Sequence, residues 1–208
     1  VNAKLILRHS FRPSLKNIED PDNVSLTNEG LKIAYDFGAK LDYPIGELIS
    51  SKVLRCRQTI EQIQQGSRVK HTKTIDLVDM KMFYTYDSIL SDITFKEEKN
   101  GKSIISKLLS NEALPGFYTL DKCVSNFLDY IFAIGNIKNS LDIICTHDFQ
   151  IMYFVSWLFK YSSDIEFIKN QWPRIMEGVV LWGVRNDFYC IWRSNIKHFV
   201  DSREIVRI

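Results

Sequence analysis

The sequence predicts an α/β fold with a mostly parallel central sheet, and two features of the chain lead to this prediction. Apolar runs of strand length alternate with segments whose apolar residues recur at helical spacing, which is the pattern of βα units. Two of the apolar runs, at residues 3–7 and 141–146, break off directly into polar residues that include a histidine. Ligands bind beyond the carboxyl ends of strands in open α/β sheets, so these breaks also indicate where a site lies.

Size and composition favour one compact domain over residues 1–208. Hydrophobic residues make up 45% of the chain and charged residues 25%, a balance typical of globular proteins in water. A net charge of +2 gives no reason to expect nucleic acid or a membrane surface as partner. The longest apolar run, residues 151–159 apart from Ser156, is too short to span a membrane, and we expect no secretory leader. We expect a cytoplasmic protein, and the sequence gives no indication of its oligomeric state.

The cysteines and histidines do not suggest a metal site. The four cysteines are widely spaced inside apolar patterns and are expected to be free, buried thiols, as in a reducing compartment. The four histidines show no metal-ligand spacing, and the chain contains no Cys-x-x-Cys. We therefore expect neither a metal nor a cofactor.

The first half of the chain predicts two strands, each followed by a helix. Residues 3–7 form the first strand, and the polar, proline-containing stretch 11–25 reads as an active-site loop. A helix begins after Thr27, which is a good N-cap, and its apolar positions continue to residue 41. Residues 48–51 form a second strand, and a second helix ends near Gly66. The buried stripe of this second helix consists of Cys56, Thr59, Ile60 and Ile63.

The second half predicts a third strand at 74–78 and a helix-rich insertion at 79–119. This insertion is the least regular part of the chain, and we expect its short helices to form a small cap over the sheet. Periodicity and apolar runs then predict a helix at about 120–135, a buried strand at 141–146, a core helix at 149–161, an edge hairpin of strands 178–182 and 188–192, and a last short strand within 199–208.

Arg8, His9 and Arg12 lie where the first strand ends. Positive groups this close repel one another, so the arrangement is poor for stability but suits an anion with several oxygens, above all a phosphoryl group. Neutral imidazole is a nucleophile near pH 7, and arginine can hold phosphate oxygens with two parallel hydrogen bonds. The alternative is a chance Arg-His pair on an exposed surface.

Arg55 falls in the first turn of the second helix, where the helix dipole disfavours a cation. One interpretation is an exposed arginine that tolerates this small cost. The other is that Arg55 and the helix N-terminus converge on the same anion as Arg8 and His9, and we favour it.

His147 and Asp148 follow the strand at 141–146. A lone histidine in such a place is normally a satisfied core residue, and Asp148 could serve only as the cap of the next helix. Two strand-end histidines in one chain make a shared site the better hypothesis.

These stretches, taken in order, resemble the histidine phosphatase superfamily, which includes phosphoglycerate mutases and histidine acid phosphatases. Residues 7–13 resemble its Arg-His-Gly motif, in the form with a second arginine three residues after the histidine. Residues 50–59 resemble the stretch Ser-Ser-x-x-x-Arg-x-x-Gln-Thr and select Arg55 rather than Arg57. Residues 145–148 resemble the His-Asp motif of the acid-phosphatase branch. One departure is Ser10, where the family usually has glycine, and the chain length is nearer to that of the mutase branch.

The resemblance implies a three-layer α/β/α sandwich and a metal-independent hydrolase of small phosphomonoesters. His9 would be the nucleophile that forms a phosphohistidine, and Arg8, Arg12, Arg55 and His147 would bind and neutralise the phosphoryl group. Asp148 would be the general acid and base. The mutase branch instead takes this group from the middle of the chain, where Asp79 is the nearest equivalent, although a solvated loop carboxylate is the better interpretation of Asp79. Alternatives are a phosphoglycerate-mutase-type phosphotransferase and a non-catalytic module that binds phosphorylated ligands or proteins.

Overall fold

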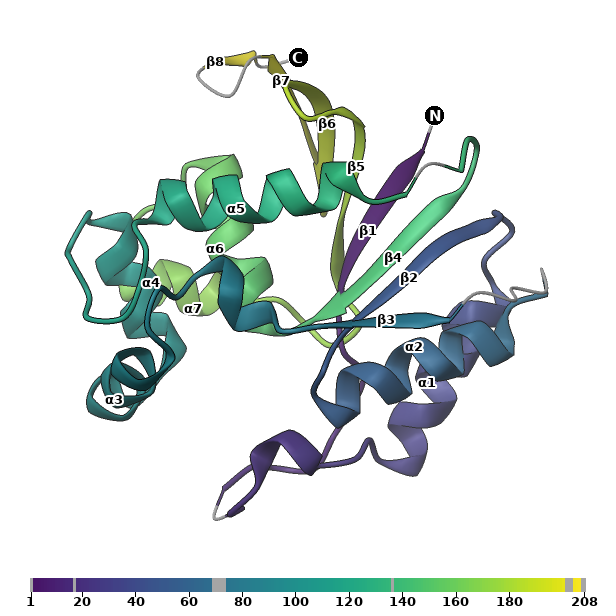
Figure 1. Cartoon of the computed structure of the whole chain (residues 1–208), viewed down its shortest axis with the longest axis horizontal. Helices are drawn as coiled ribbons and strands as arrows, with labels where there is room; N and C mark the ends of the chain where they lie inside the picture. Colours follow the sequence, from purple (N-terminus) through teal and green to yellow (C-terminus); the bar gives the residue numbers. More distant parts are fainter. Residues whose placement is uncertain (1, 17, 69–73, 136, 201–203, 207–208) are drawn as a thin grey trace. The chain divides into compact units, whose positions relative to one another are not determined.

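The computed structural model describes residues 2–16, 18–68, 74–135, 137–200 and 204–206 (Figure 1). The chain packs into two compact units. Unit 1 comprises Val1–Val78, Ile134–His147 and Arg174–Ile208, and unit 2 comprises Asp79–Ala133 and Asp148–Pro173. The chain thus leaves unit 1 after β3 (Ile75–Val78), and again directly after His147.

Unit 1 is organised around one sheet, whose strand order is β3-β2-β4-β1-β5-β6-β7-β8. The strands β1 (Ala3–Arg8), β4 (Leu141–Thr146), β2 (Ile45–Ser51) and β3 are parallel to their neighbours within this group. From β5 onwards every pairing is antiparallel. The predicted α/β class with a parallel sheet core is therefore confirmed.

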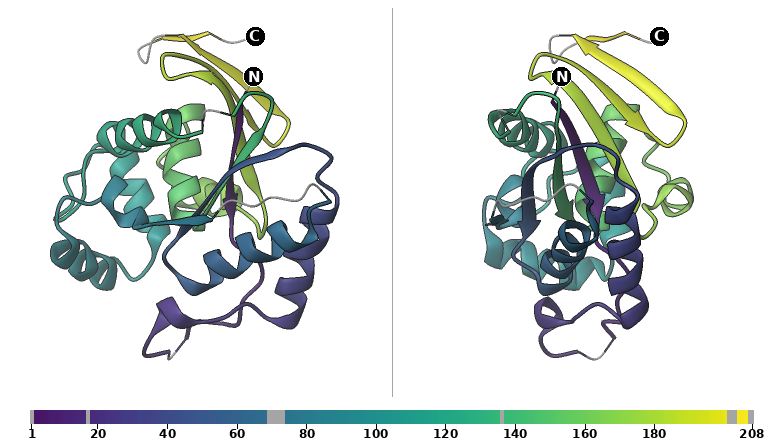
Figure 2. Two further views of the ribbon diagram at one scale, coloured as in Figure 1. Left: turned by 45° about the vertical axis from the view of Figure 1, so that its right-hand side comes forward. Right: turned by 90° about the vertical axis from the view of Figure 1, so that its right-hand side faces the viewer.

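The antiparallel strands are β5 (Gly178–Val184), β6 (Asp187–Trp192), β7 (Asn195–Val200) and β8 (Glu204–Val206) (Figure 2). The predicted hairpin of β5 and β6 is confirmed, but its predicted place at the sheet edge is wrong, because β7 and β8 pair beyond it. The last short strand predicted within 199–208 is confirmed as β8, but β7, which begins at Asn195, was not predicted. Alternation explains the error, since β7 is polar on one face and buries little more than Phe199.

The helices α1 (Asn28–Ala39) and α2 (Leu54–Gly66) pack side by side against one face of the parallel strands (Figure 1). Thr27 caps α1 as predicted, since its hydroxyl accepts a 3.0 Å hydrogen bond from the Gly30 N–H. The two helices approach closely because Gly38 has no side chain: a Cβ there would clash with the carbonyl oxygen of Ile63. The shared core contains Leu5, Leu7, Ala34, Ile45, Leu48, Cys56, Ile60, Ile63, Ile143 and Cys145.

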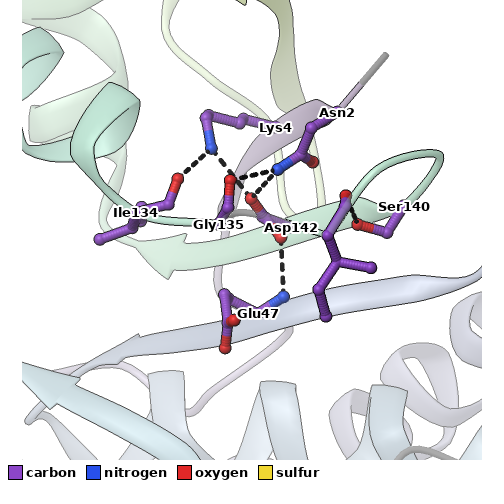
Figure 3. Close-up of polar contacts among 8 residues, drawn as sticks. Asn2, Lys4, Glu47, Ile134, Gly135, Ser140 and Asp142 are labelled. Carbon is purple, nitrogen blue, oxygen red and sulfur yellow. Dashed lines mark hydrogen bonds and ion pairs between the residues drawn. The ribbon is translucent and has the colours of Figure 1, made fainter.

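A buried ion pair joins β1 and β4 at their amino ends, opposite the predicted site (Figure 3). Lys4 Nζ lies 2.9 Å from Asp142 Oδ2, and both side chains are almost fully buried. Lys4 also donates to the carbonyl oxygen of Ile134 at 2.7 Å, while the Asp142 carboxylate accepts from Asn2 Nδ2 at 2.9 Å and from the Glu47 N–H at 2.7 Å. The network therefore ties β1, β2 and β4 to the segment where the chain re-enters unit 1.

Replacing Lys4 by methionine is expected to destabilise the protein by about 3–5 kcal/mol, because it leaves the Asp142 charge buried without its ion partner. Urea unfolding at neutral pH measures this loss. The control is Lys32→Met, since Lys32 pairs with Asp36 across an exposed turn of α1 and such pairs contribute about 0.5 kcal/mol or less. Equal effects of the two substitutions would contradict a structural role for the buried pair.

Unit 2 is helical and has an aromatic core. Residues 79–119 form short helices, as predicted: η2 (Met80–Phe83), α3 (Ser88–Glu98) and α4 (Gly101–Leu109). The unit also contains α5 (Leu120–Ala133), α6 (Asp148–Phe159) and α7 (Ile165–Gln171), of which α7 was not predicted. The core includes Phe83, Tyr84, Phe117, Phe127, Tyr153 and Phe154. That residues 79–119 cap the sheet remains a prediction.

Helix α6 is buried on nearly every side, as its continuous apolar sequence predicts. A turn forms at Pro115-Gly116: Gly116 has a φ of +83°, which favours glycine, and its carbonyl oxygen accepts a hydrogen bond from the Tyr86 N–H. Of the helices in the described parts of the chain, none has the length and apolar character needed to cross a membrane.

Candidate active site

The carboxyl ends of three neighbouring strands meet in unit 1, and the predicted site residues of β1, β4 and α2 come together there. Arg8 pairs with Thr146 in the register of β1 and β4, and the His9 N–H donates to the carbonyl oxygen of Thr146 at 3.0 Å. This register brings the rings of His9 and His147 edge to face, with centroids 5.5 Å apart. The two histidines that follow buried strands in the sequence are therefore neighbours in the structure, as predicted.

The contacts of His9 define which ring nitrogen carries the proton. His9 Nδ1 lies 2.8 Å from the carbonyl oxygen of Ser10. A carbonyl oxygen can only accept, so Nδ1 carries the hydrogen and Nε2 keeps its lone pair. Arg55 agrees with this assignment, because its Nε–H donates to His9 Nε2 at 3.2 Å.

The surroundings of His9 also keep the ring neutral. Only 3% of the residue is exposed. Burial, the neighbouring His147 and the charges of Arg55 and Arg8 lower the pKa of His9 from 6.5 to about 2, and the hydrogen bond to Ser10 opposes them only in part. His9 is therefore a neutral imidazole at physiological pH, with the lone pair of Nε2 directed at a guanidinium.

Arg55, in the first turn of α2, connects the histidines to the loop after β1. It is buried, and three different nitrogens of its guanidinium have partners. Besides Nε on His9, Nη1 donates to the carbonyl oxygen of Pro21 at 2.8 Å and Nη2 lies 3.4 Å from His147 Nδ1. The interpretation of Arg55 as an exposed arginine is therefore wrong, and its register, rather than that of Arg57, faces the histidines.

His147 is half-buried and lies between Arg55 and the end of β2. Its Nδ1 faces the guanidinium, which can only donate, so Nε2 carries the hydrogen and donates to Ser51 Oγ at 3.1 Å. The thiol of Cys56 lies 3.7 Å from Nε2 and 3.9 Å from Nδ1. Burial raises the pKa of the Cys56 thiol, but contacts with Cys145, His147 and Arg55 outweigh it and lower the pKa.

Arg8 and Arg12 are both half-buried. Of the two, Arg8 is the one whose charge is seen to affect the pKa of His9. Arg8 ends β1 and contributes to the lowered pKa of His9. The described contact of Arg12 is local, since its Nη1 donates to the carbonyl oxygen of Pro13 at 2.7 Å. The part of Arg12 in binding phosphate stays a prediction.

Asp148 and Asp79, the two candidate acids, belong to unit 2. Helix α6 begins at Asp148, whose carboxylate accepts a 2.9 Å hydrogen bond from the Phe149 N–H. Asp79 is exposed and caps η2 by accepting from the Lys81 N–H at 3.0 Å. Each carboxylate thus has a local helix-capping contact, and the catalytic assignment of either one stays a prediction.

The roles of several residues that hold the site together were not predicted from the sequence. Ser10 supplies the acceptor for His9, Pro21 the acceptor for Arg55, and Ser51 the partner of His147. Thr59 Oγ1 accepts a hydrogen bond from the Ser10 N–H. Both Ser51 and Thr59 lie within the stretch 50–59, so the motif itself indicated them. The roles of Ser10 and Pro21 depend on loop carbonyls, for which no sequence pattern exists.

The cysteines are free and buried, as predicted. Burial raises the pKa of Cys123 to about 12, and the pKa values of Cys145 and Cys190 are also raised. Within the described residues, no group of three or more His, Cys, Asp or Glu side chains is arranged to hold a metal ion.

The fold and the motifs of this site resemble those of the histidine phosphatase type. Residues 5–104, just under half of the chain, match the family model of the histidine phosphatase superfamily (branch 1). The resemblance predicted from the sequence is thereby confirmed. A comparison with curated proteins gives no match.

Several solved structures have a similar fold. YhfR from Bacillus stearothermophilus has a TM-score of 0.65 at 12% identity, over 94% of this chain and 98% of its own. A mycobacterial glucosyl-3-phosphoglycerate phosphatase has a TM-score of 0.58 at 10% identity, over 93% and 99%. A mutant phosphoserine phosphatase from Entamoeba histolytica, in complex with phosphoserine, has a TM-score of 0.56 at 14% identity, over 99% and 96%. At these identities the likeness concerns the fold.

Proposed function

We propose that the protein is a metal-independent phosphomonoester hydrolase that acts through a phosphohistidine on His9. The observation that carries this proposal is the state of His9: a buried, neutral ring whose Nδ1–H is held by the Ser10 carbonyl and whose Nε2 keeps its lone pair, towards which Arg55 Nε–H donates. A nucleophile of this kind needs no further base, because it attacks without losing a proton.

The proposed reaction has two displacements at phosphorus. In the first, the Nε2–P bond forms as the bond to the leaving oxygen breaks, and a general acid protonates that oxygen. In the second, water attacks phosphorus and the N–P bond breaks. The general acid, now deprotonated, takes a proton from the water. Inorganic phosphate leaves, and His9 returns to its neutral form.

Positive charge and hydrogen-bond donors around His9 support the binding of a phosphoryl group. Phosphoryl transfer depends mostly on in-line positioning and on neutralising the equatorial oxygens. Arg55 and His147 lie in contact with each other, Arg8 lies beside His9, and Arg12 is the further candidate. Val53, at the N-cap of α2, has no side-chain hydrogen bond to the helix. N–H groups of the first turn could therefore donate to a bound anion. These groups would take the place of a metal.

The activities of two proteins of similar structure, a glucosyl-3-phosphoglycerate phosphatase and a phosphoserine phosphatase, support a phosphomonoester as the substrate class. The free, buried thiols support a cytoplasmic location.

A panel of phosphomonoesters, assayed for released inorganic phosphate with and without exhaustive chelation, tests the proposed function. We expect hydrolysis of at least one ester at an unchanged rate in chelator. Loss of activity that Mg²⁺ restores would contradict metal independence. Isomerisation of a phosphorylated acid without phosphate release would identify a mutase, and binding without turnover would identify a non-catalytic module.

Asp148 is proposed as the acid and base, and its replacement gives a prediction that depends on the leaving group. Asp148→Asn is expected to slow alkyl phosphates strongly but an activated aryl phosphate much less in the phosphorylation step, because an aryl oxide needs little protonation. Asp79→Asn is the control and should change neither rate greatly. Stopped-flow measurement of phosphorylation with both ester types separates the two. The reverse pattern would assign the acid to Asp79 and leave Asp148 as a helix cap.

A further inference from the structure

Ser10 lies between the candidate nucleophile, His9, and the exposed Phe11. The family that this chain resembles usually has glycine at this position. It is fully buried, and its three polar groups all have partners in unit 1. Its carbonyl oxygen accepts from His9 Nδ1 at 2.8 Å, its N–H donates to Thr59 Oγ1 at 3.0 Å, and its hydroxyl donates to the Gly30 carbonyl oxygen at 2.7 Å. The side chain therefore adds a contact that glycine cannot make.

We infer that Ser10 is a positioning residue for His9, and that its hydroxyl fixes the carbonyl that selects the Nδ1–H tautomer. The inference deepens the proposed function, since the selected tautomer is the one with a nucleophilic Nε2. Ser10 does not touch the reacting atoms and acts only through the ring of His9.

The backbone around Ser10 is held from two helices. The hydrogen bond to Gly30 ties Ser10 to the first turn of α1, and the one from its N–H ties it to α2. The next carbonyl, that of Phe11, accepts from the Thr27 N–H at 3.0 Å. These three anchors restrict the rotation of the peptide that carries the Ser10 carbonyl. Glycine at this position would have more backbone freedom and one anchor fewer.

The same hydrogen bonds connect the nucleophile to its arginine. Thr59 Oγ1 accepts from Ser10 and donates to the carbonyl oxygen of Arg55 at 2.7 Å. His9 and Arg55 are therefore positioned on one chain of contacts. If the Ser10 carbonyl turned away, Nδ1–H would lose its acceptor in a buried place, and the Nε2–H tautomer would compete. That tautomer can neither accept from Arg55 Nε nor attack phosphorus through Nε2.

Nitrogen NMR of ¹⁵N-histidine-labelled protein tests the inference without any substrate. Protonated and unprotonated ring nitrogens give separate signals, and His9→Asn assigns those of His9. We expect a single Nδ1–H tautomer in the wild type, and a mixture with Nε2–H in Ser10→Ala and Ser10→Gly. Glycine is the residue usual in the family, so this variant should fold even if the alanine variant does not.

Ser140→Ala is the matched control. Ser140 is also fully buried in unit 1, and its hydroxyl donates to a backbone carbonyl, that of Ile137, at 2.7 Å, near the amino end of β4 (Figure 3). It should lose stability to a similar degree but keep the His9 tautomer. A single Nδ1–H tautomer in both Ser10 variants would overturn the inference and leave Ser10 as a packing residue.

Kinetics gives the second readout. With the ester found in the panel, Ser10→Ala and Ser10→Gly should lower kcat roughly 10- to 100-fold and leave KM nearly unchanged, because the arginines still bind the phosphoryl group. A kcat equal to that of Ser140→Ala would contradict the inference. If the wild type hydrolysed no ester, the proposed function would fail, while the tautomer measurement would still decide the role of Ser10.

Discussion

Replacing His9 by alanine is expected to remove essentially all turnover while the fold remains. The nucleophile is lost, and the described site holds no second imidazole at its position, since His147 follows β4 and contacts Ser51 and Arg55. Steady-state hydrolysis measures the loss, and circular dichroism with thermal unfolding checks the fold. His9→Asn is the second variant, because its amide N–H can still donate towards the Ser10 carbonyl although it cannot attack phosphorus. Substantial turnover in either folded variant would end the phosphohistidine mechanism.

Replacing His9 by asparagine should also change how the stability of the protein depends on pH. The pKa of His9 is about 2 in the folded protein but near 6.5 in the unfolded chain. As the pH falls below about 6.5, the unfolded chain binds a proton that the folded state does not, so stability is lost. Urea unfolding at pH 7 and pH 5 should show a larger loss in the wild type than in His9→Asn. A larger loss in the variant would contradict the buried, neutral state of His9.

Arg55→Lys is expected to lower turnover by roughly 10²-fold or more, although it keeps the positive charge. Lysine presents a point charge and cannot reach His9, His147 and the Pro21 carbonyl together, as the guanidinium does. The substitution thus removes the fixed geometry at the phosphoryl site and releases the loop at Pro21. Rates with a saturating ester measure the effect on kcat.

Arg57→Lys is the control for Arg55, since it lies two residues further along α2 and has no described contact with either histidine. Its rate should remain within a few-fold of the wild type. If the two lysine variants behaved alike, the assignment of Arg55 as the arginine of the site would be wrong.

The sequence allowed the strand ends and the helix of the site to be predicted because these depend on local pattern. Two apolar runs stop at Arg8-His9 and at His147, and the buried stripe of the second helix includes Cys56 and Thr59. These patterns determine which backbone positions meet at the carboxyl ends of the strands. The parallel register then brings the two histidines together without further information. Arg55 followed from its place in the first turn of that helix.

The contacts that set the chemistry of the site could not be predicted in the same way. The tautomer of His9 depends on the direction of the Ser10 carbonyl, and the anchoring of Arg55 depends on the carbonyl of Pro21. Every residue carries a carbonyl, so no residue type marks these positions. β7 escaped correct prediction for a related reason: its polar, half-exposed sequence pairs with β6 through the backbone.

Chemical trapping of the phosphorylated enzyme tests the central claim most directly. Wild-type protein is mixed briefly with a radiolabelled phosphomonoester, quenched in alkali, and mapped by proteolysis. The account predicts an acid-labile, alkali-stable phosphate on the peptide that contains His9, attached at Nε2 because Nδ1 carries a proton held by Ser10. Label on His147, on a carboxylate or at Nδ1 of His9, or turnover that leaves no labelled protein at any quench time, would contradict it.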